Sequence, residues 1–228
     1  MKLRKYPVPF YYFTRFLFNL MLFCLGGRLK VVGREKLPAS GPYLVVSNHM
    51  SIADAPIFMM ALPPFTIHFW IADKWRDMFL FGFLASRVGG IFINREGLDR
   101  KALKQAVAIL RAGGVVGLAP EATRSPIGQI IRPKNGAAYL ANQAQCTIVP
   151  IGIIGSDKLF ANFLRLKTTP ITVQFGDPFQ LPPGKKRVRS KDLQAYTDFI
   201  MLRIAKLLPA SQHGYYAERM KGERRVTS

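Results

Sequence analysis

Residues 90–119 read GIFINREGLDRKALKQAVAILRAGGVVGLA, and this stretch decides the fold. Its two ends, Gly90–Ile93 and Val115–Ala119, are short apolar runs typical of buried strands. Between them, residues 98–110 carry apolar side chains at helical spacing, and Gly113-Gly114 closes that helix. Strand, helix and strand in this order form a parallel crossover unit. The sequence therefore predicts an α/β protein whose mostly parallel central sheet is flanked by helices.

Polar and charged side chains follow three of the expected strands. The strand at residues 43–46 leads into His49, the next leads into Arg95, and the third leads into Glu121 and Arg124. Because the carboxyl ends of parallel strands meet at one edge of a sheet, residues that follow successive strands are brought together there. We therefore expect these four side chains to share one cleft.

His49 and Asp54 are a candidate general base and its orienting acid. An imidazole titrates near neutral pH, so it can take a proton from a hydroxyl and later return it. A carboxylate on its other ring nitrogen fixes the tautomer and stabilises the imidazolium. The structural alternative is that this segment only begins a helix, with Ser47 or Asn48 as the cap.

Four short blocks resemble the glycerolipid acyltransferase family, in particular the 1-acylglycerol-3-phosphate (lysophosphatidate) acyltransferases. The first block is a histidine and an aspartate separated by four residues, and the resemblance covers roughly residues 28 to 180. The blocks stand in the family's order: NHMSIAD at 48–54, GIFINR at 90–95, PEATRS at 120–125 and IVPIG at 148–152.

The resemblance implies transfer of a fatty acyl group from a thioester, on coenzyme A or acyl carrier protein, to a glycerolipid hydroxyl, most of all that of 1-acylglycerol-3-phosphate. His49 would be the base and Asp54 its orienter, with no metal and no cofactor beyond the thioester co-substrate. The first and third blocks also place Asn48 and Thr123 among the substrate-binding residues.

Arg95 and Arg124 would bind the acceptor phosphate, because a guanidinium matches phosphate oxygens with paired hydrogen bonds. Alternatively, each arginine caps a sheet edge or pairs with a nearby glutamate. Glu121 could position the acceptor hydroxyls or hold Arg124. Lys134 could meet a donor or acceptor phosphate, or be a solvated loop charge.

The third block departs from the family pattern. The family usually has an aromatic residue before the proline and a glycine after the glutamate, where this chain has Ala119 and Ala122. An alanine adopts positive φ at a cost and adds a methyl group where a ligand could approach. An alternative acceptor therefore stays open, namely another lyso-lipid such as an amino-acid or sugar lipid.

The composition favours a membrane-surface enzyme. The chain has 33 Lys and Arg against 13 Asp and Glu, a formal charge of +20, yet 49% of its residues are apolar. This combination points to an anionic membrane surface as a partner. A non-enzymatic protein that binds anionic membrane or nucleic acid is a remote alternative, and no nucleic-acid partner is expected because no nucleic-acid-binding motif is present. Two cysteines without a Cys-x-x-Cys pair predict no metal site.

An apolar, aromatic-rich segment at residues 9–26 predicts an N-terminal membrane-anchoring helix. As a helix it would span about 27 Å, barely the thickness of a hydrocarbon core, and it contains Arg15 and Asn19. An interfacial or re-entrant anchor is therefore favoured over a spanning helix. A signal peptide is the other alternative, but no small-x-small cleavage site follows.

The expected organisation is a membrane-associated segment at 1–27, an acyltransferase domain at 28–209 and a basic C-terminal tail at 210–228. A catalytic domain on the cytoplasmic face fits, since thioester donors are made in the cytoplasm. Residues 70–88 are too apolar all round for an ordinary surface helix. They predict a buried helix beside an acyl-chain tunnel, a second membrane contact, or plain core.

Overall fold

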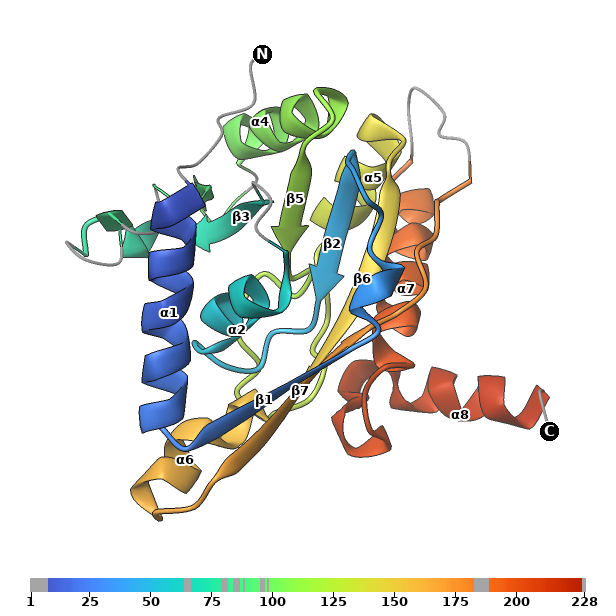
Figure 1. Cartoon of the computed structure of the whole chain (residues 1–228). Helices are drawn as coiled ribbons and strands as arrows, with labels where there is room; N and C mark the ends of the chain where they lie inside the picture. The colour runs from blue at the N-terminus through green and yellow to red at the C-terminus, as the bar shows by residue number, and fades with distance from the viewer. Residues whose placement is uncertain are drawn as a thin grey trace.

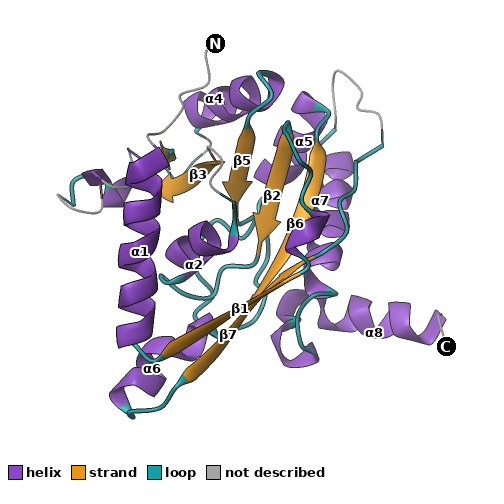
Figure 2. Cartoon of the chain, viewed as in Figure 1, coloured by secondary structure: helices purple, strands orange, loops and turns teal. Residues whose placement is uncertain are grey.

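The computed structural model describes residues 8–63, 67–78, 82–83, 87, 89–94, 97, 99–182 and 189–226. Within these residues, seven strands form one sheet with helices on both sides (Figures 1 and 2). The strands are β1 Gly27–Val32, β2 Tyr43–Ser47, β3 Ile67–Ala72, β4 Gly90–Ile93, β5 Val115–Leu118, β6 Thr147–Ile154 and β7 Thr169–Phe175. The helices are α1 Val8–Cys24, α2 Asp54–Ala61, α4 Arg100–Arg111, α5 Gly136–Ala144, α6 Leu159–Leu164, α7 Ser190–Ala205 and α8 Ala217–Val226. Short 3-10 turns are η1 Arg34–Lys36, η2 Asp73–Trp75, η3 Ser156–Lys158, η4 Ala210–Gln212 and η5 Gly214–Tyr216.

The strand order is β1-β7-β6-β2-β5-β3-β4. Strands β2 to β6 run parallel, as the pairings β2–β5, β2–β6, β3–β5 and β3–β4 show. β7 is antiparallel to β6, and β1 pairs parallel with β7 at the sheet edge. The predicted mostly parallel α/β sheet is thus confirmed, with one reversed pair of strands added to it.

Two apolar clusters hold the helices on opposite faces of the sheet. Side chains alternate along β2, so Leu44 and Val46 pack with α4, α5 and α7, whereas Tyr43 and Val45 pack with α1, α2 and α6. All five residues of β2 are buried. A central parallel strand is covered on both faces, which is why it reads as one continuous apolar run.

The predicted crossover joins β4 to β5 through α4 and passes over β3. The helix begins at Arg100, two residues later than its apolar spacing indicates, because the Asp99 side chain caps it by accepting a hydrogen bond from the Ala102 N–H at 2.9 Å. Its apolar face lies against the sheet and its charged face is exposed. The crossover brings the carboxyl ends of β4 and β5 to the edge where β2 ends.

Helix α1 lies against α2 on one side and is exposed on the other (Figure 1). The Tyr11 hydroxyl donates to the carbonyl oxygens of Met59 and Leu62, at 3.0 and 3.1 Å, and Leu22 is buried. None of the helices in the described part of the chain is both long and apolar enough to cross a membrane. That α1 anchors the chain at a membrane stays a prediction.

The C-terminal residues differ from the basic tail predicted from residue 210. They form η4, η5 and α8, and Tyr216 is fully buried. The Tyr216 hydroxyl donates to Asp198 on α7 at 2.7 Å, and Arg219 forms an ion pair with the same carboxylate. The packed domain therefore continues well past residue 209, since these contacts fasten its C-terminal segment to α7.

Candidate active site

The loop between β2 and α2 holds His49 beside Asp54. Asp54 is the first residue of α2, and its Oδ2 lies 2.9 Å from His49 Nδ1. The same oxygen accepts the backbone N–H groups of Met50 and Ser51, at 2.7 and 2.8 Å. Neither Ser47 nor Asn48 caps this helix; Ala53 is its N-cap residue, without a side-chain hydrogen bond. The carboxylate thus fixes both the loop and the imidazole ring.

The two members of this pair differ in exposure. The side chain of His49 is 16% exposed and that of Asp54 is 5% exposed. When Nδ1 carries the proton, it donates to Asp54, and Nε2 is left as the proton acceptor. The arrangement can therefore remove a proton from a hydroxyl group that reaches Nε2.

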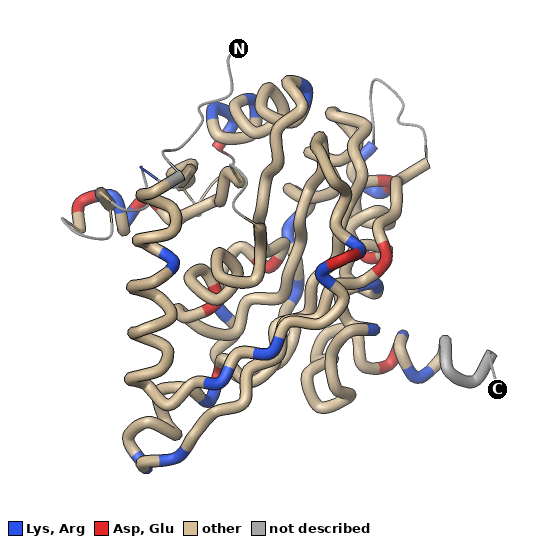
Figure 3. The backbone as a smooth tube through the Cα atoms, viewed as in Figure 1, with Lys and Arg blue, Asp and Glu red and all other residues tan. Residues whose placement is uncertain are grey.

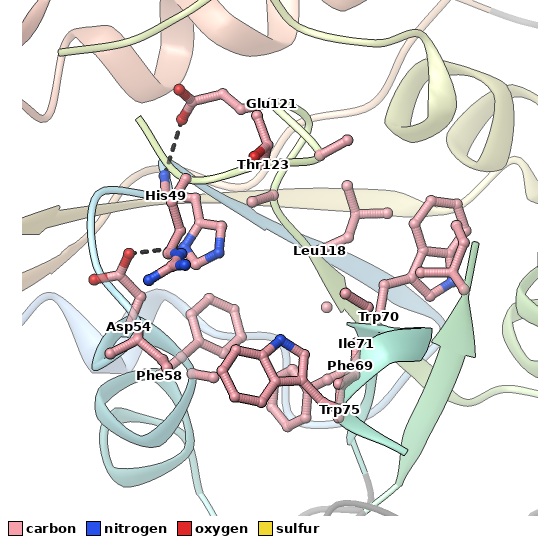
Figure 4. Close-up of a pocket in the computed structure, with 18 of the residues that line it drawn as sticks. His49, Asp54, Phe58, Phe69, Trp70, Ile71, Trp75, Leu118, Glu121 and Thr123 are labelled. Atoms are coloured by element: carbon pink, nitrogen blue, oxygen red, sulfur yellow. Dashed lines mark hydrogen bonds and ion pairs between the residues drawn. The ribbon is translucent and has the colours of Figure 1, made fainter. Parts of the chain in front are cut away.

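Glu121 supports the same loop from the β5 side. Its Oε1 accepts the backbone N–H of His49 at 2.9 Å (Figure 4), and its Oε2 accepts the N–H of Ile131 at the same distance. Glu121 is 2% exposed, and burial raises the pKa of its carboxyl group from an ordinary 4.5 to about 7. The two predicted roles, contact with acceptor hydroxyls and support of Arg124, omit this link to the His49 backbone.

Asn48 joins the loop to β6. Its amide nitrogen donates to the carbonyl oxygen of Ile153, and its carbonyl oxygen accepts the N–H of Ile153, both at 2.8 Å. The residue is fully buried. These bonds engage the side chain with backbone, which favours a positioning role over the predicted contact with substrate.

A cavity of about 660 Å³ opens beside His49. His49, Asp54 and Glu121 line it, together with Thr123, Arg124 and Lys134. The structure therefore brings these six predicted residues to one place. Arg95 lies outside the described residues, although its neighbour Asn94 is part of the cavity wall.

Aromatic side chains form much of the apolar part of this wall. Phe58 comes from α2, Phe69 and Trp70 from β3, and Trp75 from η2, and Figure 4 shows them below and beside the imidazole. Phe18 of α1 also lines the cavity. A buried helix was predicted for residues 70–88. Up to Trp75 this segment is instead a strand and a 3-10 turn at the cavity, and much of the remainder lies outside the described residues.

In the third block, Ala122 has a backbone conformation that is typical of glycine, the residue usual at this position in the family. Ala122 has a φ of +58°, in the left-handed region that non-glycine residues rarely occupy. Ala122 is part of the cavity wall. Arg124 and Thr123 follow at once and are exposed, so the strained residue directs the next two side chains to the mouth of the cavity.

A protein-family model described as Acyltransferase matches residues 28–154, which include every strand end around this cavity. The chain belongs to the acyltransferase family. Family membership agrees with the resemblance carried by the four blocks.

Relatives of this acyltransferase share its sequence over most of its length. It is 25% identical over 197 residues to a 1-acyl-sn-glycerol-3-phosphate acyltransferase of Bacillus subtilis, covering 82% of this chain and 92% of that protein. It is 31% identical over 188 residues to the human 1-acyl-sn-glycerol-3-phosphate acyltransferase alpha, covering 76% of this chain and 65% of the human protein. The chain thus spans nearly all of the bacterial relative but under two thirds of the human one.

The fold of the acyltransferase also matches a solved structure. The crystal structure of the 1-acyl-sn-glycerophosphate (LPA) acyltransferase PlsC from Thermotoga maritima superposes with a TM-score of 0.68 at 20% sequence identity. The match covers 86% of this chain and 78% of that one. It supports the fold described above.

Two features of the site lie beyond the sequence argument. The links from Glu121 to His49 and from Asn48 to Ile153 join residues 72 and 105 positions apart, so no local spacing reveals them. The contribution of Phe18 to the cavity is likewise a tertiary contact. The apolar character of residues 70–88 is the signal in the sequence that pointed toward an apolar wall.

Proposed function

We propose that this acyltransferase moves a fatty acyl group from a thioester, on coenzyme A or acyl carrier protein, to the free hydroxyl of 1-acylglycerol-3-phosphate. The observation that carries the proposal is the His49–Asp54 pair at a cavity that is aromatic on one side and cationic at its mouth. An apolar wall suits acyl chains, and guanidinium and ammonium groups suit phosphates. The names of the relatives support the choice of acceptor.

The reaction needs one base and no enzyme nucleophile. The acceptor hydroxyl oxygen attacks the thioester carbonyl carbon as its proton passes to His49 Nε2, and Asp54 stabilises the imidazolium through Nδ1. The carbon–sulfur bond of the resulting tetrahedral intermediate then breaks, and the leaving thiolate takes the proton from Nε2. Ester and free thiol are the products. A positioned base contributes roughly 100- to 10,000-fold to such a step.

Arg124 and Lys134 hold the acceptor phosphate in this proposal, and Thr123 contacts the acceptor beside them. Both cations are exposed at the mouth of the cavity. Glu121 and Asn48 act one step back: Glu121 Oε1 fixes the backbone N–H of His49, and the pairing with Ile153 fixes the preceding residue, Asn48. Arg95 completes the phosphate contacts on the strength of its motif block.

Panel assays with purified protein test the acceptor and the donor together. The protein is incubated with acyl-coenzyme A or acyl carrier protein and a set of lyso-lipids, and new diacyl products are followed by mass spectrometry. Phosphatidic acid formed from 1-acylglycerol-3-phosphate is the expected product. A diacyl product made only from an amino-acid or sugar lyso-lipid would replace this acceptor with the alternative one.

We also propose that the enzyme works at the cytoplasmic leaflet with α1 lying in the interface. The outer face of α1 carries exposed Phe13, Phe16 and Phe23, at 55%, 62% and 78%, while Phe18 on another face reaches the cavity. One helix thus touches both the proposed bilayer and the proposed acyl site. Phe13→Glu with Phe16→Glu should weaken binding to anionic vesicles, and unchanged binding would place the membrane contact elsewhere.

A further inference from the structure

Helix α6 and the turn that leads from it to β7, together called the α6–β7 turn, expose four large apolar side chains within seven residues. Phe160 and Phe163 are 45% and 41% exposed, and Leu164 and Leu166 are 81% and 96% exposed. Single exposed apolar residues are ordinary, but a contiguous group of them marks a surface that meets an apolar partner. The catalytic cavity does not use any of the four.

The turn holds Leu166 outward by its own hydrogen bonds. The Leu166 N–H donates to the Phe163 carbonyl at 3.0 Å, and the Lys167 N–H donates to the Asn162 carbonyl at 2.9 Å. Leu166 has a φ of +54°, an uncommon conformation for a branched side chain. The fold therefore keeps this leucine fixed in a strained conformation in which water surrounds its side chain.

This turn lies beside the C-terminal end of α1. The Thr169 N–H donates to the Gly26 carbonyl at 2.8 Å, and Leu22 of α1 packs in the same apolar cluster as Leu159 of α6. Figure 1 shows α6 next to the lower end of α1. The exposed apolar residues of the turn therefore lie near the C-terminal end of the helix, where Phe23 is exposed.

Cations surround the apolar group. Lys158, Arg165 and Lys167 belong to the same segment and are exposed, and Arg28 and Lys30 lie on β1, the neighbour of β7. Figure 3 shows basic residues at the tip of the turn and along β1. Leucine and phenylalanine flanked by lysine and arginine match the acyl-chain boundary and the anionic head groups of a leaflet.

We propose that residues 160–167 insert into an anionic leaflet as a second membrane contact alongside α1. The proposal rests on the membrane-surface function proposed above. Two contacts, one along α1 and one at its end, fix the tilt of the domain on the membrane, whereas a single helix leaves the domain free to rotate about the helix axis. The cavity lined by Phe18 would then keep a constant position relative to the lipid surface.

Vesicle co-sedimentation tests this second contact directly. The full chain with Leu164→Glu and Leu166→Glu is compared with wild type on vesicles of phosphatidylcholine with phosphatidylglycerol. The matched control is Gln105→Glu with Ala112→Glu, which adds the same charge on and after α4, at the far end of the molecule (Figure 1). We expect partitioning to fall about tenfold or more in the turn variant and little in the control. Equal partitioning of both variants would overturn the proposal.

A second measurement reports insertion rather than charge. In a Cys24→Ser background, where Cys146 is buried, Leu166→Cys is labelled with an environment-sensitive fluorophore. We expect its emission to shift to the blue when vesicles are added and to be quenched by spin-labelled lipid. The same label at Gln105→Cys should show neither effect. A label whose emission does not shift would show that the turn stays in water. A wild-type dimer that the turn variant converts to monomer in the absence of lipid would assign this surface to contact with a second copy of the chain. Either result would overturn the proposal.

Turnover separates this proposal from the proposed function. Acyl transfer to a short-chain, water-soluble lysophosphatidate should be unchanged in the turn variant, because the cavity is untouched. If wild type makes no diacyl product at all while its turn still inserts, the proposed reaction fails and the membrane contact stands. If wild type is active and the label at residue 166 stays in water, only the membrane contact fails.

Discussion

The backbone N–H of His49 donates a 2.9 Å hydrogen bond to Oε1 of Glu121. The proposed base is therefore held from two sides, by Asp54 on its ring and by Glu121 on its main chain. Glu121 also accepts the Ile131 N–H, so it couples the β2–α2 loop to the segment that follows β5. A buried carboxyl group with two backbone donors stiffens the site because moving either segment would leave a polar group unpaired.

The raised pKa of Glu121 makes stability depend on pH. Folded protein holds the Glu121 proton up to about pH 7, whereas the unfolded chain releases it near the ordinary 4.5. Between these values the native state binds more protons, so the free energy of unfolding falls as pH rises, by about 3 kcal/mol from this group. Chemical denaturation at pH 4.5 and pH 8 should show the fall in wild type and a smaller one in Glu121→Gln. An equal fall in the free energy of unfolding in wild type and in Glu121→Gln would assign the pH dependence to other groups.

Asp54→Asn should impair turnover more than binding. The amide oxygen can still accept the Met50 and Ser51 N–H groups, so the loop should persist, but the charge that stabilises an imidazolium is lost. We expect kcat to fall about 100-fold or more with little change in either KM. Steady-state kinetics and a melting curve measure the two effects. A fall below fivefold in a folded variant would remove Asp54 from the proton-transfer step.

Ala122→Gly should stabilise the protein. Glycine adopts a φ of +58° without the penalty that alanine meets there, although it also gains freedom in the unfolded chain. The expected net gain is about 0.5–1 kcal/mol, or roughly 1–4 °C in Tm for a chain of this size. Ala112, at a φ of −83°, is the matched control, and its change to glycine should destabilise. A lower Tm for Ala122→Gly would contradict the strain assigned to this position.

Arg124→Ala should raise the KM for the acceptor more than the KM for the donor. The guanidinium is exposed at the cavity mouth, where a lysophosphatidate head group would enter. Arg132 is exposed nearby but is not part of the cavity wall, so Arg132→Ala is the matched control. We expect roughly a tenfold or larger acceptor effect for Arg124 alone, the loss of a charge-assisted contact. A larger effect on the donor would move Arg124 to the thioester site.

Much of the fold follows from local pattern. The apolar runs before Arg95 and Glu121 and the helical spacing over residues 98–110 predict the crossover, because strand and helix periods are properties of short segments. The reversal of β7 is different. It is a pairing between Ile151–Ile154 and Thr172–Phe175, and the register of strand pairing depends on side chains distant in sequence.

The C-terminal segment shows how composition misleads. Its many basic residues favour a solvated tail, yet Tyr216 and Met220 lie one helical turn apart and both are buried. Two apolar side chains are too few for a periodic signal, and the hydrogen bond from Tyr216 to Asp198 that secures them is tertiary. The His49–Asp54 pair was predictable because its spacing is local, whereas the roles of Glu121 and Asn48 required the folded chain.

One assay tests the central claim that His49 is the proton acceptor for acyl transfer. Wild type and His49→Ala, matched for vesicle binding and Tm, are given 1-acylglycerol-3-phosphate and the thioester donor that wild type uses, and diacyl product is counted over time. The account predicts a loss of about 100-fold or more in His49→Ala with lipid binding retained. Turnover near the wild-type rate in the folded variant would contradict it and assign the proton to another group.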